Sequence, residues 1–255
     1  MKIWTIKGKH LLLFFFCLIS GIITLSLVLT TTMNVATTAK EVRDIPIYCV
    51  ETDEKKVSIS FDAAWGNEQT ETLLEILEEK NVKATFFLVG EWVEKYPESV
   101  KAIADKGHDV ENHSSSHPYM TQLSDSKMAE EIRSCNEKIE SITGKCPTLF
   151  RPPYGDYNNQ VVKAVKDSGM YCIQWDIDSL DWKDPSPAEM VQKITSKLRN
   201  GSIILMHNGA KNTPEALPMI IDAVRSAGYE FVPISELVPE GDYTTDHEGR
   251  MHLCE

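Results

Sequence analysis

The sequence predicts an α/β protein, a distorted (β/α) barrel of seven to eight parallel strands with an N-terminal transmembrane helix. Short apolar segments alternate with amphipathic helical segments along most of the chain, which indicates parallel strands joined by helices. The number of these units favours closure into a barrel over an open doubly wound sheet, the alternative architecture. An uncharged segment of 19 residues, 11–29, precedes the alternating region.

This uncharged segment is long enough to cross the roughly 30 Å hydrocarbon core of a membrane as a helix. The positive-inside rule places residues 1–10 in the cytoplasm and the rest of the chain outside, because lysines precede the segment at Lys2, Lys7 and Lys9. A cleaved signal peptide is the alternative, since small residues follow at Thr37, Thr38 and Ala39. The apolar run exceeds a typical signal core, which favours an uncleaved single-pass anchor in the cell membrane.

Regular alternation begins after a polar stalk expected at residues 30–56. Val57, Ile59 and Phe61 alternate with serines, as in a strand. A helix is expected from Asn67, with apolar leucines on one face. The following elements are a strand at 84–89, a helix at 96–106 that stops at Gly107, and a short strand at 108–111.

Helix ends are marked most clearly in the second half. Ser124 precedes a long helix that ends at Gly144, where a left-handed residue is favoured. Ser186 and Glu189 form a capping box with Pro187 at the first helical position, and this helix is expected to run to residue 200. The remaining segments are strands at 148–150, 170–175, 203–206 and 229–232, and helices at 160–168 and 213–228. The barrel domain is therefore expected at 57–240, with a polar, loose tail at 241–255.

Composition excludes some functions. The net charge of −12 argues against a nucleic-acid partner, whose binding needs a basic surface. No glycine-rich phosphate loop follows the first strand, so no nucleotide is expected there. The six cysteines lack metal-site spacing; free buried thiols are the simpler interpretation, and a bridge between Cys135 and Cys146 is the alternative.

Polar residues follow five of the predicted strands. In a parallel barrel they meet at the carboxyl-terminal rim, where active sites of barrel enzymes are assembled. Each has an ordinary alternative by itself: an aspartate caps turns, and a histidine after an apolar strand is often a core residue. Their common position at one rim is what indicates a site. They are Asp62, His113 with His117, Arg151, Asp181 with Trp182, and His207.

These residues occur in an ordered set of motifs that resembles the polysaccharide deacetylase family (NodB-type homology domain, carbohydrate esterase family four). The resemblance spans residues 57–237. The motifs are Ser-Phe-Asp62, His113-x-x-x-His117, Arg151-Pro-Pro-Tyr154, Asp178-x-x-Asp181-Trp182 and Leu205-x-His207.

The resemblance implies a role for each residue. His113 and His117 would hold a divalent metal ion, zinc, which acidifies water and polarises a carbonyl group. Asp62 would be the general base, paired with Arg151, and His207 the general acid, kept protonated by Asp181. The remaining roles implied are an oxyanion contact from the backbone N–H of Tyr154 and a wall for the acetyl group made by Trp182 and Leu205.

One position departs from the family. Its first motif normally carries two consecutive aspartates, the second of which is a metal ligand, but here Asp62 is followed by Ala63-Ala64-Trp65-Gly66. Glu68 or Asn67 could supply another donor. This variant motif resembles a membrane-associated, sporulation-related subgroup of the family.

The expected function is metal-dependent hydrolysis of the N-acetyl group of N-acetylated sugars in cell-wall polysaccharide, peptidoglycan or a related glycan. The partners expected are this glycan and the membrane. Two alternatives stay open: a glycan-binding pseudoenzyme with weak or no activity, suggested by Ala63, and an esterase that acts on O-acetyl groups.

Overall fold

The computed structural model describes residues 8–36 and 43–254, and the chain divides into two units, residues 1–43 and 44–255. The first unit contains helix α1 (Gly8–Ala36). Its segment Gly8–Ser26 is long and apolar enough to cross a membrane. Residues 1–7 and the alternative cleavage site at Thr37, Thr38 and Ala39 lie outside the described residues.

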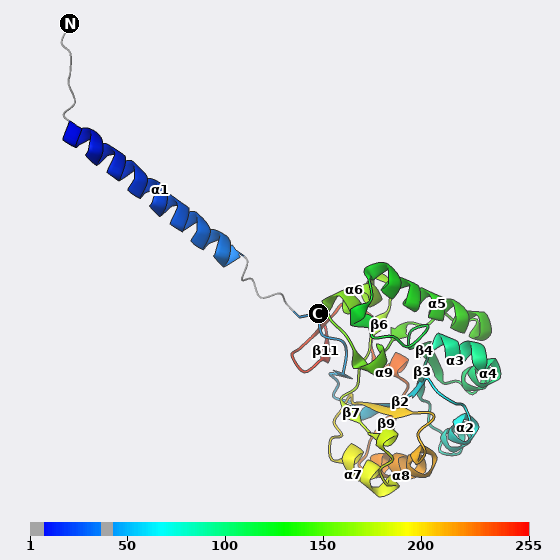
Figure 1. The fold of residues 1–255 in the computed structure, drawn as a ribbon. Coiled ribbons are helices and arrows are strands. Elements are labelled where there is room, and N and C mark those ends of the chain that lie inside the picture. Colours follow the sequence, from blue (N-terminus) through cyan, green and yellow to red (C-terminus); the bar gives the residue numbers. More distant parts are fainter. Residues whose placement is uncertain (1–7, 37–42, 255) are drawn as a thin grey trace. The chain divides into compact units, whose positions relative to one another are not determined.

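The second unit is built on a curled parallel sheet, as predicted (Figure 1). Seven strands follow one another in the order β6-β5-β4-β3-β2-β8-β7, and β9 pairs with β2, so eight strands take part. Among the described residues no ladder joins β6 to β7, and the barrel is open there. The strands are β2 (Lys56–Ala63), β3 (Thr85–Leu88), β4 (Asp109–Asn112), β5 (Leu149–Phe150), β6 (Tyr171–Cys172), β7 (Ile177–Asp178), β8 (Ile203–His207) and β9 (Glu230–Phe231).

Helices cover the outside of this sheet (Figure 1), and neighbouring helices contact one another in the order α7-α8-α2-α4-α3-α5-α6. The capping box of Ser186 and Glu189 is formed, and Gly144 ends α5 with a φ of 71°, both as predicted. The helices are α2 (Thr70–Glu79), α3 (Gly90–Lys95), α4 (Pro97–Asp105), α5 (Asp125–Thr143), α6 (Asn159–Asp167), α7 (Pro187–Thr195), α8 (Thr213–Ser226) and α9 (Ile234–Leu237).

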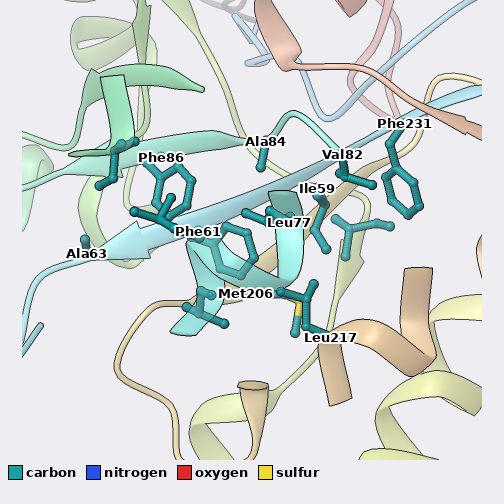
Figure 2. Packing of buried hydrophobic residues seen from close by; sticks show 14 of the residues in the cluster. Ile59, Phe61, Ala63, Leu77, Val82, Ala84, Phe86, Met206, Leu217 and Phe231 are labelled. Atoms are coloured by element: carbon teal, nitrogen blue, oxygen red, sulfur yellow. The ribbon is translucent and has the colours of Figure 1, made fainter. Parts of the chain in front are cut away.

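Strand β2 lies in the interior of the sheet, between β3 and β8, and separates two environments. Ile59, Phe61 and Ala63 join the main apolar cluster with residues of β3, α2 and α8 (Figure 2). Successive side chains of a strand point to opposite faces, so Ser60 and Asp62 point away from this cluster. Both are buried, and the Ser60 hydroxyl donates to the carbonyl oxygen of Ile204 at 2.8 Å. The alternation of apolar residues and serines therefore marks a strand that is buried on both faces.

The structure corrects the expected extent of the stalk and the tail. The globular unit begins at residue 44, and Ile47, Cys49 and Val50 are buried in it. Strand β1 (Cys49–Val50) pairs with β11 (Arg250–Leu253), which pairs in turn with β10 (Tyr243–Thr245). Segments about 200 residues apart thus form one small sheet, a non-local pairing that local polarity does not reveal.

Smaller corrections concern single elements. The expected strand at 170–175 is only the short strand β6, and Asp181 follows a separate short strand, β7, at the opposite edge of the sheet. Helix α7 ends at Thr195 rather than near residue 200. Helix α3 and the 3₁₀ turns η1 (Met120–Gln122), η2 (Pro153–Gly155) and η3 (Asp181–Lys183) were not predicted. The described cysteines are all free, which excludes the bridge between Cys135 and Cys146 in this structure.

Candidate active site

The predicted site residues meet at the carboxyl ends of the strands. Asp62 and His207 are register partners in the β2–β8 ladder, and His113 and Arg151 directly follow β4 and β5. A cavity of about 430 Å³ opens among them. Its lining comprises Asp62, Ala64, Trp65, His113, His117, Tyr154, Trp175, Asp178, Trp182, Leu205 and His207. Arg151 and Asp181 are fully buried and support the lining residues.

Asp62 and Arg151 form a buried ion pair. The Arg151 guanidinium donates to Asp62 Oδ1 at 2.7 Å, to Ser60 Oγ at 2.9 Å and to the carbonyl oxygen of Gln174 at 3.2 Å. Burial alone would raise the pKa of Asp62, but the charge of Arg151, with smaller contributions from His113, His207 and the Arg151 hydrogen bond, outweighs burial and the pKa is lowered. Asp62 is therefore an ionised carboxylate at neutral pH, fixed in orientation by its partner.

The two histidines of the His113-x-x-x-His117 motif lie side by side in the loop after β4, with ring centroids 5.0 Å apart. His113 Nδ1 donates to the carbonyl oxygen of Arg151 at 2.7 Å, which leaves Nε2 facing Asp62 Oδ2 at 3.4 Å. Burial lowers the pKa of both rings, that of His117 to about 4. The backbone brings the rings together through a turn, because His117 has a φ of 59° and is not helical.

His207 and Asp181 form a second pair at the cavity. Asp181 Oδ1 accepts from His207 Nδ1 at 2.7 Å, and Asp181 Oδ2 accepts from the His207 backbone N–H at 2.7 Å and from the Thr213 hydroxyl at 2.8 Å. Burial would lower the pKa of His207, but the hydrogen bond and charge of Asp181, assisted by Asp62 and Asp178, raise it. The protonated form of His207 is thus favoured. Its Nδ1 is bound to Asp181, which leaves Nε2 as the other ring nitrogen.

Backbone strain gathers in the loops that carry these motifs. Among the described residues, five of the six non-glycine residues with positive φ lie there: Ser114, His117, Tyr154, Leu180 and Asp184. Such conformations cost roughly 1–3 kcal/mol each and persist where the surroundings hold them. At Tyr154, with a φ of 59°, the ring contacts His117 at a centroid distance of 4.5 Å. Trp182 and Leu205 both line the cavity.

The residues present do not fit a complete metal site. Ala63, at the position of the family's second aspartate, is a buried methyl group of the apolar cluster (Figure 2) and does not line the cavity. Within residues 8–36 and 43–254, no group of three His, Cys, Asp or Glu side chains is arranged to hold a metal ion. Glu68 and Asn67 are absent from the lining, and the Asn67 amide donates to Ser99 at 3.0 Å. Two imidazoles fall short of the three or four protein ligands that hold zinc.

Several residues in the cavity lining or behind it were not predicted. Trp65 packs on His207, with ring centroids 6.0 Å apart and planes 25° apart. Trp175 faces the Arg151 guanidinium at 5.6 Å, and Ser60 and Thr213 complete the two buried pairs. The position of Trp65 just after the first strand was a usable signal, since residues after barrel strands reach the rim. Nothing local marks the other three.

The fold and the cavity define a class of protein, parallel α/β barrels with a carboxylate–arginine pair and a carboxylate–histidine pair at the strand ends. The chain belongs to the polysaccharide deacetylase family, whose model, described as "Polysaccharide deacetylase", matches residues 50–173. It is 33% identical over 194 residues to a peptidoglycan-N-acetylglucosamine deacetylase of Bacillus cereus, covering 74% of this chain and 91% of that protein.

Other similar proteins include an uncharacterized protein, a pseudoenzyme and a longer deacetylase. The chain is 37% identical to the uncharacterized protein YlxY of Bacillus subtilis (strain 168), over 76% of this chain and 61% of that protein. Among solved structures, a CE4 family pseudoenzyme from Bacillus anthracis has a TM-score of 0.73 and 38% identity, over 75% of this chain and 68% of that chain. The chain spans only 39% of the peptidoglycan-N-acetylglucosamine deacetylase PgdA of Listeria monocytogenes, at 36% identity.

Proposed function

We propose that this protein hydrolyses the N-acetyl group of N-acetylated sugars in cell-wall polysaccharide, peptidoglycan or a related glycan. The observation that carries the proposal is that an ionised Asp62 and a His207 with a raised pKa line the same cavity. Each is held in place by its own buried partner, Arg151 for Asp62 and Asp181 for His207. A carboxylate base and an imidazolium acid facing one cavity are what hydrolysis of an amide requires.

In the proposed reaction, Asp62 takes a proton from a water molecule while the water oxygen bonds to the acetyl carbonyl carbon. The developing oxyanion accepts a hydrogen bond from the Tyr154 backbone N–H, a contact worth about 3 kcal/mol in other hydrolases. His207 then gives its proton to the sugar nitrogen as the C–N bond breaks, which releases acetate and a free amine. Trp182 and Leu205 enclose the acetyl methyl group.

No step of this proposal passes through the zinc ion that the resemblance implies, because the donor set is incomplete. We further propose that α1 is an uncleaved single-pass membrane anchor with the globular unit outside the cell, where its glycan lies. The length and apolar composition of Gly8–Ser26 support this. Membership of a sporulation-related subgroup stays a prediction from the variant first motif.

The test is acetate release from N-acetylglucosamine oligomers and from peptidoglycan by the detergent-solubilised full chain. Asp62→Asn and His207→Ala should each lower the rate by at least about 100-fold, the usual worth of a positioned acid or base. The matched controls, Asp222→Asn and His247→Ala, change exposed residues and should leave the rate unchanged. Release that is absent from the folded protein, or equal in all variants, contradicts the proposal. Release from O-acetylated but not N-acetylated glycan identifies an esterase instead.

A glycan-binding pseudoenzyme is the second candidate, and Ala63 is the observation that favours it. The similar Bacillus anthracis protein is a CE4 family pseudoenzyme, and a mutant of it is described as having restored enzymatic activity. Glycan binding in calorimetry without acetate release would support this candidate. The retention of both buried pairs favours the enzyme, since a binding module needs no acid and base together.

A further inference from the structure

Exposed aromatic rings of the globular unit gather around the cavity. Trp65, Tyr119, Tyr154 and Trp182 are each between 50% and 58% exposed. The other large apolar side chains that are exposed among the described residues of this unit are Met219 and Leu253. Exposed aromatic surface is unfavourable in water unless a partner covers it, so its concentration at a cavity mouth points to a ligand.

Trp65 lies at the edge of the cavity, next to a backbone carbonyl that is held by two hydrogen bonds. The carbonyl oxygen of the next residue, Gly66, accepts hydrogen bonds from Trp92 Nε1 and from the Asn208 amide, both at 3.1 Å. One face of the Trp65 indole packs on the His207 ring, and the side chain as a whole remains 58% exposed. A ring fixed in this way loses little conformational freedom when a ligand covers it.

A second aromatic group, Tyr119 and Tyr154, lies beside His117. Tyr119 stacks on Tyr154 with centroids 4.3 Å apart and planes 15° apart, and Tyr154 in turn contacts His117. Trp65 contacts His207, so the two aromatic groups adjoin different histidines of the site. A ligand that extends from the cavity past both histidines meets an aromatic ring on each side.

We propose that Trp65 and Tyr119 are substrate-binding residues, each stacking against a sugar ring next to the sugar whose acetyl group enters the cavity. A pyranose ring offers an apolar face of C–H groups with its hydroxyls at the rim, which suits stacking on indole and phenol rings. The cavity volume of about 430 Å³ lies at the low end for ligand sites. It holds one acetylated sugar, and the neighbouring sugars of a chain lie across the mouth. The inference rests on the proposed function and deepens it, because it makes the site selective for oligomers over single sugars.

Calorimetry with N-acetylglucosamine and its trimer, using the full chain, tests this. Trp65→Ala and Tyr119→Ala should each weaken trimer binding by about tenfold, the scale of stacking on one aromatic ring. Binding of the single sugar should change less than about twofold, and Trp65→Phe should restore most of the loss. Met219→Ala, an exposed apolar residue on α8, is the matched control and should leave both affinities unchanged.

The two proposals fail separately. His207→Ala should still bind the trimer, and trimer binding that depends on Trp65 without acetate release by the wild type rejects only the deacetylase. Acetate release with unchanged kcat/KM on the trimer in both Trp65→Ala and Tyr119→Ala overturns the stacking role only. Equal losses for the single sugar and the trimer also overturn it, because the aromatic rings would then act inside the cavity.

Discussion

Replacing Arg151 by methionine tests the central electrostatic element of the site. The guanidinium is fully buried and donates hydrogen bonds to Asp62, Ser60 and Gln174, and it lies 4.0 Å from the centre of the Phe87 ring. Methionine fills much of the same space but leaves the Asp62 carboxylate buried without its positive partner. Breaking a buried ion pair in this way costs about 3–5 kcal/mol. We expect this loss in the free energy of unfolding at about pH 8, where Asp62 is charged.

The loss should depend on pH with a definite sign. In the wild type the pKa of Asp62 is lowered, so the pair stabilises the fold above the unfolded pKa and this contribution disappears as pH falls through the folded pKa. In Arg151→Met, burial acts without the opposing charge and the pKa of Asp62 rises above its unfolded value. Protonation then relieves the buried charge, so the difference between variant and wild type shrinks as pH falls toward about 5.

Urea denaturation of the detergent-solubilised full chain, followed by tryptophan fluorescence, measures these values. Arg133→Met is the matched control: Arg133 pairs with Glu137 on the exposed face of α5, and its loss should cost less than about 1 kcal/mol. The double variant Asp62→Asn/Arg151→Met should lose about 2 kcal/mol less in the free energy of unfolding than the two single variants lose together. A loss at about pH 8 no larger than that of Arg133→Met, or strict additivity in the double variant, would refute the reasoning.

Three further predictions concern the general acid, the metal and the contact between Gly201 and strand β1. Asp181→Asn removes the main charge that raises the pKa of His207. The alkaline limb of the pH profile of acetate release should therefore move to lower pH while the acid limb stays in place. An unmoved alkaline limb contradicts the role of His207 as general acid. Zinc should bind weakly and shift the melting temperature little, since stabilisation follows RT ln(1 + [L]/Kd), where [L] is the free zinc concentration. One-to-one binding at micromolar affinity in calorimetry would show that the set of metal ligands is complete. Gly201→Ala should cost more than about 2 kcal/mol in urea denaturation, because a Cβ at this φ of +76° would lie 1.8 Å from the carbonyl oxygen of Val50. Gly169→Ala, with a φ of +73° and open space, should cost only about 1 kcal/mol, and equal losses would mean that the Val50 contact contributes nothing.

Elements with local signals were predictable. The capping box at Ser186, the left-handed Gly144 and the alternation that ends at Phe61 each depend on residues close together in sequence. Strand β7 could not be found in this way, because two residues have no periodicity. It is a strand only because Ile177 and Asp178 pair with β8.

The same distinction applies to the site. Parallel strands direct the residues that follow them to one rim, so the position of Asp62, His113, Arg151 and His207 after strands was enough to bring them together. Sequence could not say that Arg151 would be fully buried beneath the cavity, because burial depends on what packs around it.

The sequence by itself determined the family, the alternating architecture and the order in which site residues reach the rim, since these follow from local periodicity and from motif spacing. The tertiary structure decided the contacts that no motif implies. It joined β1 to β11 across the length of the globular unit, separated β6 from β7 and placed Trp65 on His207. These are contacts between distant segments, and their geometry is set by packing of the whole sheet and its helices rather than by any local pattern.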